Sequence, residues 1–167
     1  MLDRTVSVVQ GDNSAIHAAL TVVRKGEILV VDGGGFLDRA IWGGIMNLSA
    51  KTHGLEGVVI DGSIRDISEI NEMGMGVFAA GFVPTGPNKG AGGKIDISIS
   101  CGNVVVKSGD IVLGDDDGIA IVPLEKSEEV FKLCEERIKM ENSIIKKIKN
   151  GIKHKDIFNI GEIPVNY

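Results

Sequence analysis

The chain has 167 residues, the size of one ordinary domain and enough to bury a hydrophobic core. Hydrophobic residues make up 43% and aromatic residues only 4%, so this core must be aliphatic. The formal net charge is −5, and no basic face precedes the last predicted helix. Because nucleic-acid binding depends on clustered cations, this balance predicts that nucleic acid is not a partner.

The cysteine pattern and the lack of a long apolar stretch indicate the compartment. Cys101 and Cys134 have no CxxC spacing and no His at ligand spacing, which argues against a zinc site or a disulfide framework. No segment approaches the roughly 20 apolar residues needed to span a bilayer, and no signal-peptide run opens the chain. We therefore expect a cytoplasmic protein without a membrane partner.

The first half of the chain alternates short apolar runs with helical periodicity. The predicted elements are a strand at 6–9, a helix beginning at Asn13 or Ser14, a strand at 27–31, a helix at 44–53, a strand at 58–60, a helix at 66–73 and a strand at 77–79. This order predicts parallel pairing with right-handed crossovers. The segment Asp32-Gly33-Gly34-Gly35 is predicted to be a turn that ends the second strand.

The second half changes character after a glycine-rich loop at 86–93. Ile95, Ile97 and Ile99 alternate with polar residues, and short apolar runs follow at 104–106, 111–113 and 119–122, which predicts antiparallel strands in a second layer. A long amphipathic helix is predicted from Ser127, as its cap, to about Lys149, with Gly151 after its end. We see no linker, so residues 1–167 are predicted to form a single domain.

The strongest candidate for chemistry is the Arg65-Asp66 pair, which follows the buried run at 58–60. In α/β sheets, ligands bind at the carboxyl ends of strands. An arginine supplies a fixed cation and an aspartate a hard oxygen ligand, a combination that suits an anionic substrate beside Mg²⁺ or Mn²⁺. The alternative is a salt-bridging pair that caps the next helix, and spacing alone favours this alternative.

Two glycine-rich segments are weaker candidates. Gly43 and Gly44 open a predicted helix, where exposed backbone N–H groups could receive a carboxylate. The alternative there is a turn that needs positive φ, and on this feature alone it is favoured. The segment 32–35 superficially resembles the loop of a nucleotide or S-adenosylmethionine site, but GxGxxG is not met, so a structural turn is the better interpretation.

Taken together, these pieces resemble the RraA-like family, which includes the class II 4-hydroxy-4-methyl-2-oxoglutarate aldolases. The family signature is a Gly, twenty residues, Arg-Asp, two residues and an acidic residue, and it is met by Gly44, Arg65, Asp66 and Glu69. The flanks are similar too, with Gly11-Asp12-Asn13 upstream and Gly109-Asp110 and Asp115-Asp116-Asp117-Gly118 downstream. The resemblance runs from about Thr5 to the end of the last helix.

This resemblance implies an α/β fold, an α-β-β-α sandwich of the swivelling β/β/α type. It also implies a homo-oligomer, a trimer or hexamer, with sites between subunits. Glu141 on the last helix matches an acidic residue that such enzymes contribute from the neighbouring subunit, and its alternative role is a solvent-facing helical Glu. Family members usually begin with an N-terminal segment that this chain lacks.

The resemblance also assigns the site. Asp66 would hold a divalent cation, Mg²⁺ or Mn²⁺, partly through water, and Arg65 would bind the substrate oxygen that becomes the enolate. The pyruvyl carboxylate would be received by the backbone of Gly43, Gly44, Ile45 and Met46. Aldolase members often carry an acidic residue where this chain has Gly44.

The expected function is therefore a divalent-metal-dependent lyase that cleaves a small 2-oxo acid to pyruvate, as an aldolase, an oxaloacetate decarboxylase or both. A metal ion and a guanidinium would stabilise the enolate where its charge develops. One alternative is a non-catalytic regulator of the ribonuclease E inhibitor type, although regulators tend to lose the aspartate retained here as Asp66. A methyltransferase is a third hypothesis, supported only by the segment 32–35.

Overall fold

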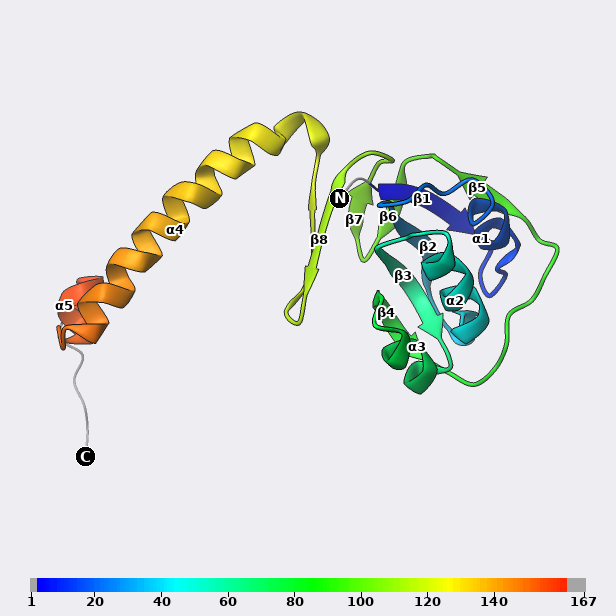
Figure 1. Cartoon of the computed structure of the whole chain (residues 1–167), viewed down its shortest axis with the longest axis horizontal. Helices are drawn as coiled ribbons and strands as arrows, with labels where there is room; N and C mark the ends of the chain where they lie inside the picture. Colours follow the sequence, from blue (N-terminus) through cyan, green and yellow to red (C-terminus); the bar gives the residue numbers. More distant parts are fainter. Residues whose placement is uncertain (1–2, 162–167) are drawn as a thin grey trace. The chain divides into compact units, whose positions relative to one another are not determined.

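The computed structural model describes residues 3–161 (Figure 1). It contains two compact units, one ending at Leu124 and the other beginning at Glu125. The first half of the first unit consists of β1 (Asp3–Val8), α1 (Ser14–Ala19), β2 (Ile28–Trp42), α2 (Gly44–Thr52), β3 (Gly57–Ile64), α3 (Ile67–Met73) and β4 (Gly76–Phe82). Its second half consists of β5 (Gly93–Ile95), β6 (Ile99–Cys101), β7 (Val104–Val106), β8 (Ile111–Asp115) and β9 (Gly118–Val122).

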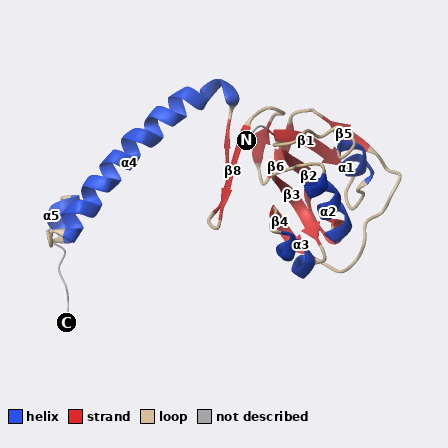
Figure 2. Cartoon of the chain, in the orientation of Figure 1, coloured by secondary structure: helices blue, strands red, loops and turns tan. Residues whose placement is uncertain are grey.

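The central sheet of the first unit has the strand order β4-β3-β2-β1-β5. β1 to β4 pair in parallel, and β5 pairs antiparallel with β1. The helices α1, α2 and α3 lie beside this sheet (Figure 2). β6 with β7, and β8 with β9, form two separate antiparallel hairpins. The parallel pairing and the later antiparallel strands are therefore both confirmed, and the chain has the predicted α/β fold.

Side-chain alternation along the strands sorts the apolar residues into two cores. Leu29 and Val31 of β2 belong to the larger core on the helix side, with residues of α1 and α2 such as Ile16 and Met46. Val30, between them in sequence, points to the other face, where it joins the smaller core formed by Ile28, Val59, Ile99, Val106 and Val112. Successive side chains of a strand point to opposite faces of the sheet, so a strand buried on both faces contributes to both cores. The sheet is therefore covered by helices on one side and by hairpins on the other.

The prediction that Asp32-Gly33-Gly34-Gly35 ends a strand was wrong. β2 continues through this segment to Trp42, and its register against β3 shifts between Asp32 and Phe36. Gly34 and Gly35 both have φ +65, and Gly34 N donates to Asp32 Oδ1 at 3.0 Å. Glycines at positive φ produce a bulge as well as a turn, and here the strand resumes after the bulge. The segment therefore leads into more strand, whereas a dinucleotide-binding loop leads into a helix.

The second unit contains α4 (Ser127–Lys149) and α5 (His154–Phe158), preceded by the 3-10 turn η1 (Leu124–Lys126). The predicted bounds of the long helix are confirmed, but Lys126 occupies the cap position and Ser127 makes no capping hydrogen bond. No α4 residue is buried, and Phe131, Leu133, Ile138, Ile145 and Ile148 are all exposed. Within residues 3–161, no helix is long and apolar enough to cross a membrane.

A buried carboxylate at the start of β1 gives the fold a pH dependence. Asp3 is 5% exposed, and its Oδ1 accepts a hydrogen bond from Gly109 N at 2.9 Å. Its Oδ2 has no partner among the residues that the structure describes. Burial is the main cause that raises the pKa of Asp3 to about 6, and the nearby charge of Asp110 raises it further. The folded chain therefore holds a proton that the unfolded chain has lost between about pH 4 and pH 6.

We expect Asp3→Asn to stabilise the protein at pH 8 by about 2 kcal/mol and to have little effect at pH 4. Because the folded-state pKa is raised, the stability of the native chain falls as the pH rises from about 4 to 6 and stays lower above that. The asparagine keeps an oxygen acceptor for Gly109 N and removes the ionisation. Urea unfolding of both proteins at the two pH values measures the difference, and an equal gain at both would contradict this explanation.

Candidate functional site

The candidate site lies where β2 and β3 end side by side. Trp42 and Ile64, the last residues of these strands, are register partners, and Arg65 N donates to Trp42 O at 3.0 Å. The residues that follow each strand therefore meet at the carboxyl edge of the sheet. This edge brings Gly43 and Gly44, from the start of α2, against Arg65 and Asp66. The predicted grouping of these four residues is observed.

Asp66 adopts an unusual backbone conformation that turns its carboxylate toward α2. Its φ of 62° and ψ of 40° lie in the left-handed region, which costs a non-glycine residue about 1 kcal/mol. Its Oδ2 accepts a hydrogen bond from Gly44 N at 3.0 Å and lies 3.5 Å from Arg65 Nε. Asp66 occupies the cap position of α3, yet its side chain makes no capping bond there. The alternative interpretation was therefore right about the salt bridge and wrong about the cap.

Gly43 and Gly44 are glycines because other groups approach them closely. A Cβ added at Gly43 would lie 2.7 Å from Asp66 Oδ2 and 3.1 Å from Arg65 Cγ. A Cβ added at Gly44 would collide with Glu69 Oε2. Gly43 has extended backbone with φ −166°, and neither glycine has positive φ, so the alternative of a positive-φ turn was wrong. Small residues here let two carboxylates and a guanidinium converge on the start of α2.

A cavity of about 200 Å³ opens beside this cluster. Its wall is formed by Asn13, His17, Ala40, Ile41, Trp42, Gly43, Ile45, Met46, Arg65, Asp66, Pro87 and Lys89. Arg65 and Asp66 keep 43% and 36% of their side chains exposed, so the cavity communicates with solvent. The predicted substrate-binding residues Gly43, Ile45, Met46 and Arg65 all contribute to the wall, and Gly44 lies between two of them.

Three polar residues of this wall were not predicted as site residues. Asn13 is 4% exposed, its Nδ2 contacts Met46 Sδ at 3.3 Å, and its Oδ1 has no hydrogen-bond partner within the described part of the chain. Burial, and then the positive charge of Lys89, lower the pKa of His17, so its imidazole is neutral at pH 7. Asn13, His17 and Lys89 give the cavity polar groups besides Arg65 and Asp66.

The residues present fit a hard, water-rich cation. One Asp66 oxygen accepts the Gly44 N–H, and the carboxylate remains open to solvent. No group of three or more His, Cys, Asp or Glu side chains placed to hold a metal ion occurs between residues 3 and 161. Zinc sites are built from three or four such ligands, whereas Mg²⁺ keeps several waters and is held by one or two carboxylates. Asp66 therefore suits Mg²⁺ or Mn²⁺ and does not suit a closed zinc site.

Glu141 belongs to the second unit, whereas Arg65 and Asp66 belong to the first. It lies on α4, where its Oε1 accepts a hydrogen bond from Arg137 Nε at 2.6 Å. Glu141 is three residues from Ile138 and four from Ile145, spacings that place all three side chains on one face of the helix. This carboxylate therefore lies along the exposed apolar stripe of α4 instead of on its polar face.

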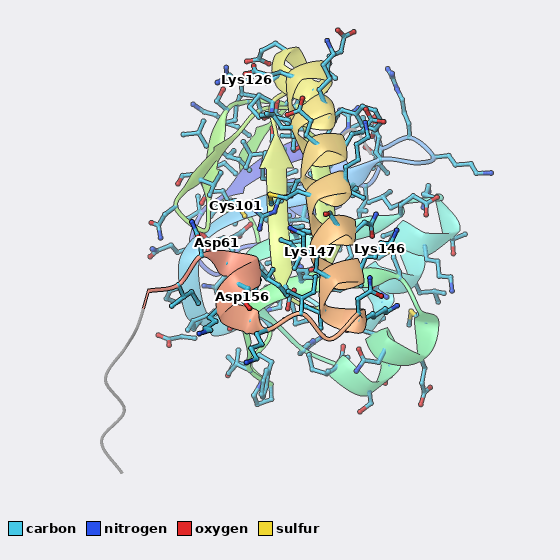
Figure 3. The ribbon with its side chains drawn as sticks, turned by 90° about the vertical axis from the view of Figure 1, so that its left-hand side faces the viewer. Asp61, Cys101, Lys126, Lys146, Lys147 and Asp156 are labelled. Carbon is cyan, nitrogen blue, oxygen red and sulfur yellow. The ribbon has the colours of Figure 1, made fainter. Side chains whose placement is uncertain are left out.

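A second cavity, of about 280 Å³, lies on the hairpin side of the sheet. Figure 3 labels two residues of its wall, Asp61 and Cys101, and Asp61 Oδ2 accepts a hydrogen bond from Gly102 N at 3.1 Å. Burial, with the negative charges of Asp61 and Asp32, raises the pKa of the Cys101 thiol to about 11. The thiol is therefore protonated at pH 7 and is a poor nucleophile. The remaining wall is mostly aliphatic, so the chemistry is concentrated in the first cavity.

Comparisons with known proteins identify a family model and relatives that are similar to this chain. Residues 4–121 match the RraA-like family model, described as Aldolase/RraA. A protein of Halalkalibacterium halodurans, provisionally named 4-hydroxy-4-methyl-2-oxoglutarate aldolase, is 36% identical over 134 residues. That alignment covers 80% of this chain and 64% of the relative, so the chain spans slightly less than two thirds of the relative's length.

Two solved structures share the fold. One is described as the S-adenosylmethionine: 2-dimethylmenaquinone methyltransferase of Geobacillus kaustophilus, with 37% identity, a TM-score of 0.70, and coverage of 73% of this chain and 75% of that chain. The other is the RNA-processing inhibitor RraA of Thermus thermophilis, with 34% identity, a TM-score of 0.68, and coverage of 72% and 73%. Because one fold carries three different names, the activity must be argued from the site.

Proposed function

This chain belongs to the RraA-like family, and we propose that it is a divalent-metal-dependent lyase that cleaves a C–C bond of a small 2-oxo acid to give pyruvate. The observation that carries the proposal is the cluster at the end of β3. Arg65 and Asp66 lie against the glycines that open α2, at the wall of a solvent-connected cavity. A fixed cation beside a carboxylate that fits Mg²⁺ or Mn²⁺ is an arrangement suited to stabilising an enolate.

The start of α2 provides a place for the substrate carboxylate. The first N–H groups of a helix have no partner within the helix and lie at the positive end of its dipole. The N–H of Gly44 is already used by Asp66, which leaves those of Ile45 and Met46 for the substrate. Both residues belong to the cavity wall. A 2-oxo acid bound there by its carboxylate would have its carbonyl oxygen close to Arg65.

Arg65 would stabilise the negative charge that develops on this oxygen. When the bond between C3 and C4 of the substrate breaks, its electron pair forms the C2–C3 double bond of the enolate, whose charge rests on the oxygen at C2. A guanidinium held in place before the reaction stabilises that charge without reorganisation. A divalent cation on Asp66 would supply additional positive charge at the same oxygen. Addition of a proton to C3 then gives pyruvate.

We further propose that the protein acts as a homo-oligomer, a trimer or hexamer, with sites between subunits. The exposed apolar stripe of α4 supports this, because such a stripe needs a covering surface. Glu141 lies on the same stripe, so a subunit that covers α4 would also receive this carboxylate. The cytoplasmic location and the absence of nucleic-acid and membrane partners stay predictions.

Metal removal tests the proposed function. We expect pyruvate release from oxaloacetate and from 4-hydroxy-4-methyl-2-oxoglutarate in the presence of Mg²⁺ or Mn²⁺, and a fall of at least about tenfold in EDTA. A lactate dehydrogenase-coupled assay measures the rate, and added Mg²⁺ in excess of EDTA should restore it. If a folded protein released no pyruvate under any of these conditions, the regulator reading would replace the lyase, as the similarity to the Thermus RNA-processing inhibitor would favour.

The methyltransferase hypothesis gains no support from the structure, despite the description of the similar Geobacillus structure. That hypothesis depended on a glycine-rich loop at 32–35. The observed segment is a bulge within β2 and continues as a strand to Trp42. A strand–loop–helix unit for a nucleotide-like cofactor is therefore not formed there.

A further inference from the structure

Glu69 lies at a spacing from the start of α3 that is typical of helix capping. It lies three residues after Asp66 in the first turn of α3, the spacing of a capping box. In a capping box the acidic side chain bonds back to the start of its own helix. The structure shows no side-chain capping bond for α3, and Glu69 Oε2 instead occupies the space that a Cβ at Gly44 would need.

The Glu69 carboxylate also differs from that of Asp66 in its contacts. Among residues 3–161, Asp66 has both the Gly44 N–H and Arg65 as partners, whereas no hydrogen bond or ion pair involves Glu69. A Cβ added at Gly44, which would collide with Glu69 Oε2, would also lie 3.5 Å from Asp66 Cβ. The Glu69 carboxylate and the Asp66 side chain therefore approach the same side of Gly44. Gly44 stands between Gly43 and Ile45 of the cavity wall. Glu69 is therefore an exposed carboxylate beside Gly44, whose two chain neighbours both belong to the cavity wall.

From this geometry, and resting on the proposed lyase function, we propose that Glu69 is the general base that removes the hydroxyl proton of a 4-hydroxy-2-oxo acid through one water molecule. In the reaction, Glu69 gains the proton as the hydroxyl oxygen forms the new carbonyl at C4. The C3–C4 bond breaks, and its electron pair forms the enolate. The same proton, returned through water to C3, completes pyruvate, so the base is regenerated and no oxidant or other reactant is consumed.

Decarboxylation of oxaloacetate separates this role from a structural one. Oxaloacetate loses CO₂ when its C3–C4 bond breaks, and its C4 carboxylate has no hydroxyl proton to remove. The electron pair forms the same enolate, and water supplies the proton to C3. A base for the hydroxyl proton is therefore needed for aldol cleavage only, whereas Arg65 is needed for both reactions.

The experiment compares Glu69→Gln and Glu69→Asp with the native protein on both substrates, with Mg²⁺ present. We expect Glu69→Gln to lower kcat for cleavage of 4-hydroxy-4-methyl-2-oxoglutarate at least about tenfold more than kcat for oxaloacetate decarboxylation. Glu69→Asp keeps the charge but shortens its reach, and it should show the same selectivity to a smaller degree. Glu72→Gln, also exposed on α3, is the matched control and should change neither rate ratio.

Equal losses in the two reactions would show that Glu69 only shapes the site and would overturn the proposal. Selective loss in Glu141→Gln, with none in Glu69→Gln, would assign the base to Glu141 and overturn the proposal as well. Thermal unfolding and gel filtration of each variant identify losses caused by misfolding, and Glu69→Asp then carries the comparison. Failure of the lyase function itself is distinguishable, because the native protein would then release pyruvate from neither substrate.

Discussion

Arg65→Ala is expected to lower kcat/KM for pyruvate release by roughly 10³-fold on both oxaloacetate and 4-hydroxy-4-methyl-2-oxoglutarate. The enolate is common to the two reactions, and the guanidinium is the protein's own positive charge at the end of β3. Removing a group that stabilises developing charge lowers kcat more than it raises KM. Because 43% of the Arg65 side chain is exposed and it belongs to neither core, the free energy of unfolding should change by less than about 1 kcal/mol.

The measurement is the initial rate of pyruvate formation at saturating and subsaturating substrate, beside urea unfolding of the same protein. Arg65→Lys keeps the charge but loses the planar guanidinium, and we expect it to recover only part of the activity. Arg24→Ala removes an exposed arginine from the loop before β2 and should leave the rate unchanged. Native-like activity in a folded Arg65→Ala protein would remove the basis of the proposed mechanism.

The fold could be predicted wherever local periodicity and burial agree. Val58, Val59 and Ile60 form an unbroken apolar run, and such a run is typical of a strand buried on both faces. The structure confirms this, with Val58 and Ile60 in the core on the helix side and Val59 in the other. The long helix was predicted with its observed bounds because Ser127, the apolar spacing and Gly151 mark its start, course and end. The structure places Gly151 at φ +74°, the conformation that a glycine adopts after a helix.

Contacts between distant segments could not be predicted in this way. Asn13 and Lys89 lie on two loops that meet because Asn88 N donates to Gly11 O at 2.7 Å and Ala91 N to Asp12 Oδ2 at 3.0 Å. Hydrogen bonds between residues this far apart in sequence leave no periodic signal. As a result, the sequence identified Arg65 and Asp66 as candidate site residues but did not identify the polar residues that share their cavity.

The local conformation of Asp66 could not be predicted from the sequence for a related reason. Its spacing to Glu69 is the spacing of a capping box, and propensity would place both carboxylates at the start of α3. Tertiary contact with α2 overrides this preference, because Gly43 and Gly44 leave room for the side chains of Arg65, Asp66 and Glu69. The glycines were predicted as a carboxylate cradle for the substrate. They also accommodate carboxylates of the protein itself.

Gly43→Ala tests that close approach directly, and we expect it to lower kcat/KM roughly 100-fold while the fold remains intact. The new Cβ would lie 2.7 Å from Asp66 Oδ2, closer than such contacts allow, and 3.1 Å from Arg65 Cγ, which is a tight contact. Both side chains are partly exposed and can move aside, so the unfolding free energy should fall by less than about 1 kcal/mol. The extended backbone at Gly43, with φ −166°, accepts alanine without strain.

Gly76→Ala, at the start of β4, is the matched control. Its added Cβ would have its nearest contact at 3.8 Å, to Phe78 Cε2, and its backbone is likewise not at positive φ. Both variants therefore add one methyl group at or next to the end of a strand, but only Gly43→Ala displaces Arg65 and Asp66. Pyruvate release and urea unfolding of the two variants separate the effects. A selective loss of activity in Gly43→Ala would place the reaction at this cluster, whereas equal activities would mean that the positions of Arg65 and Asp66 do not limit catalysis.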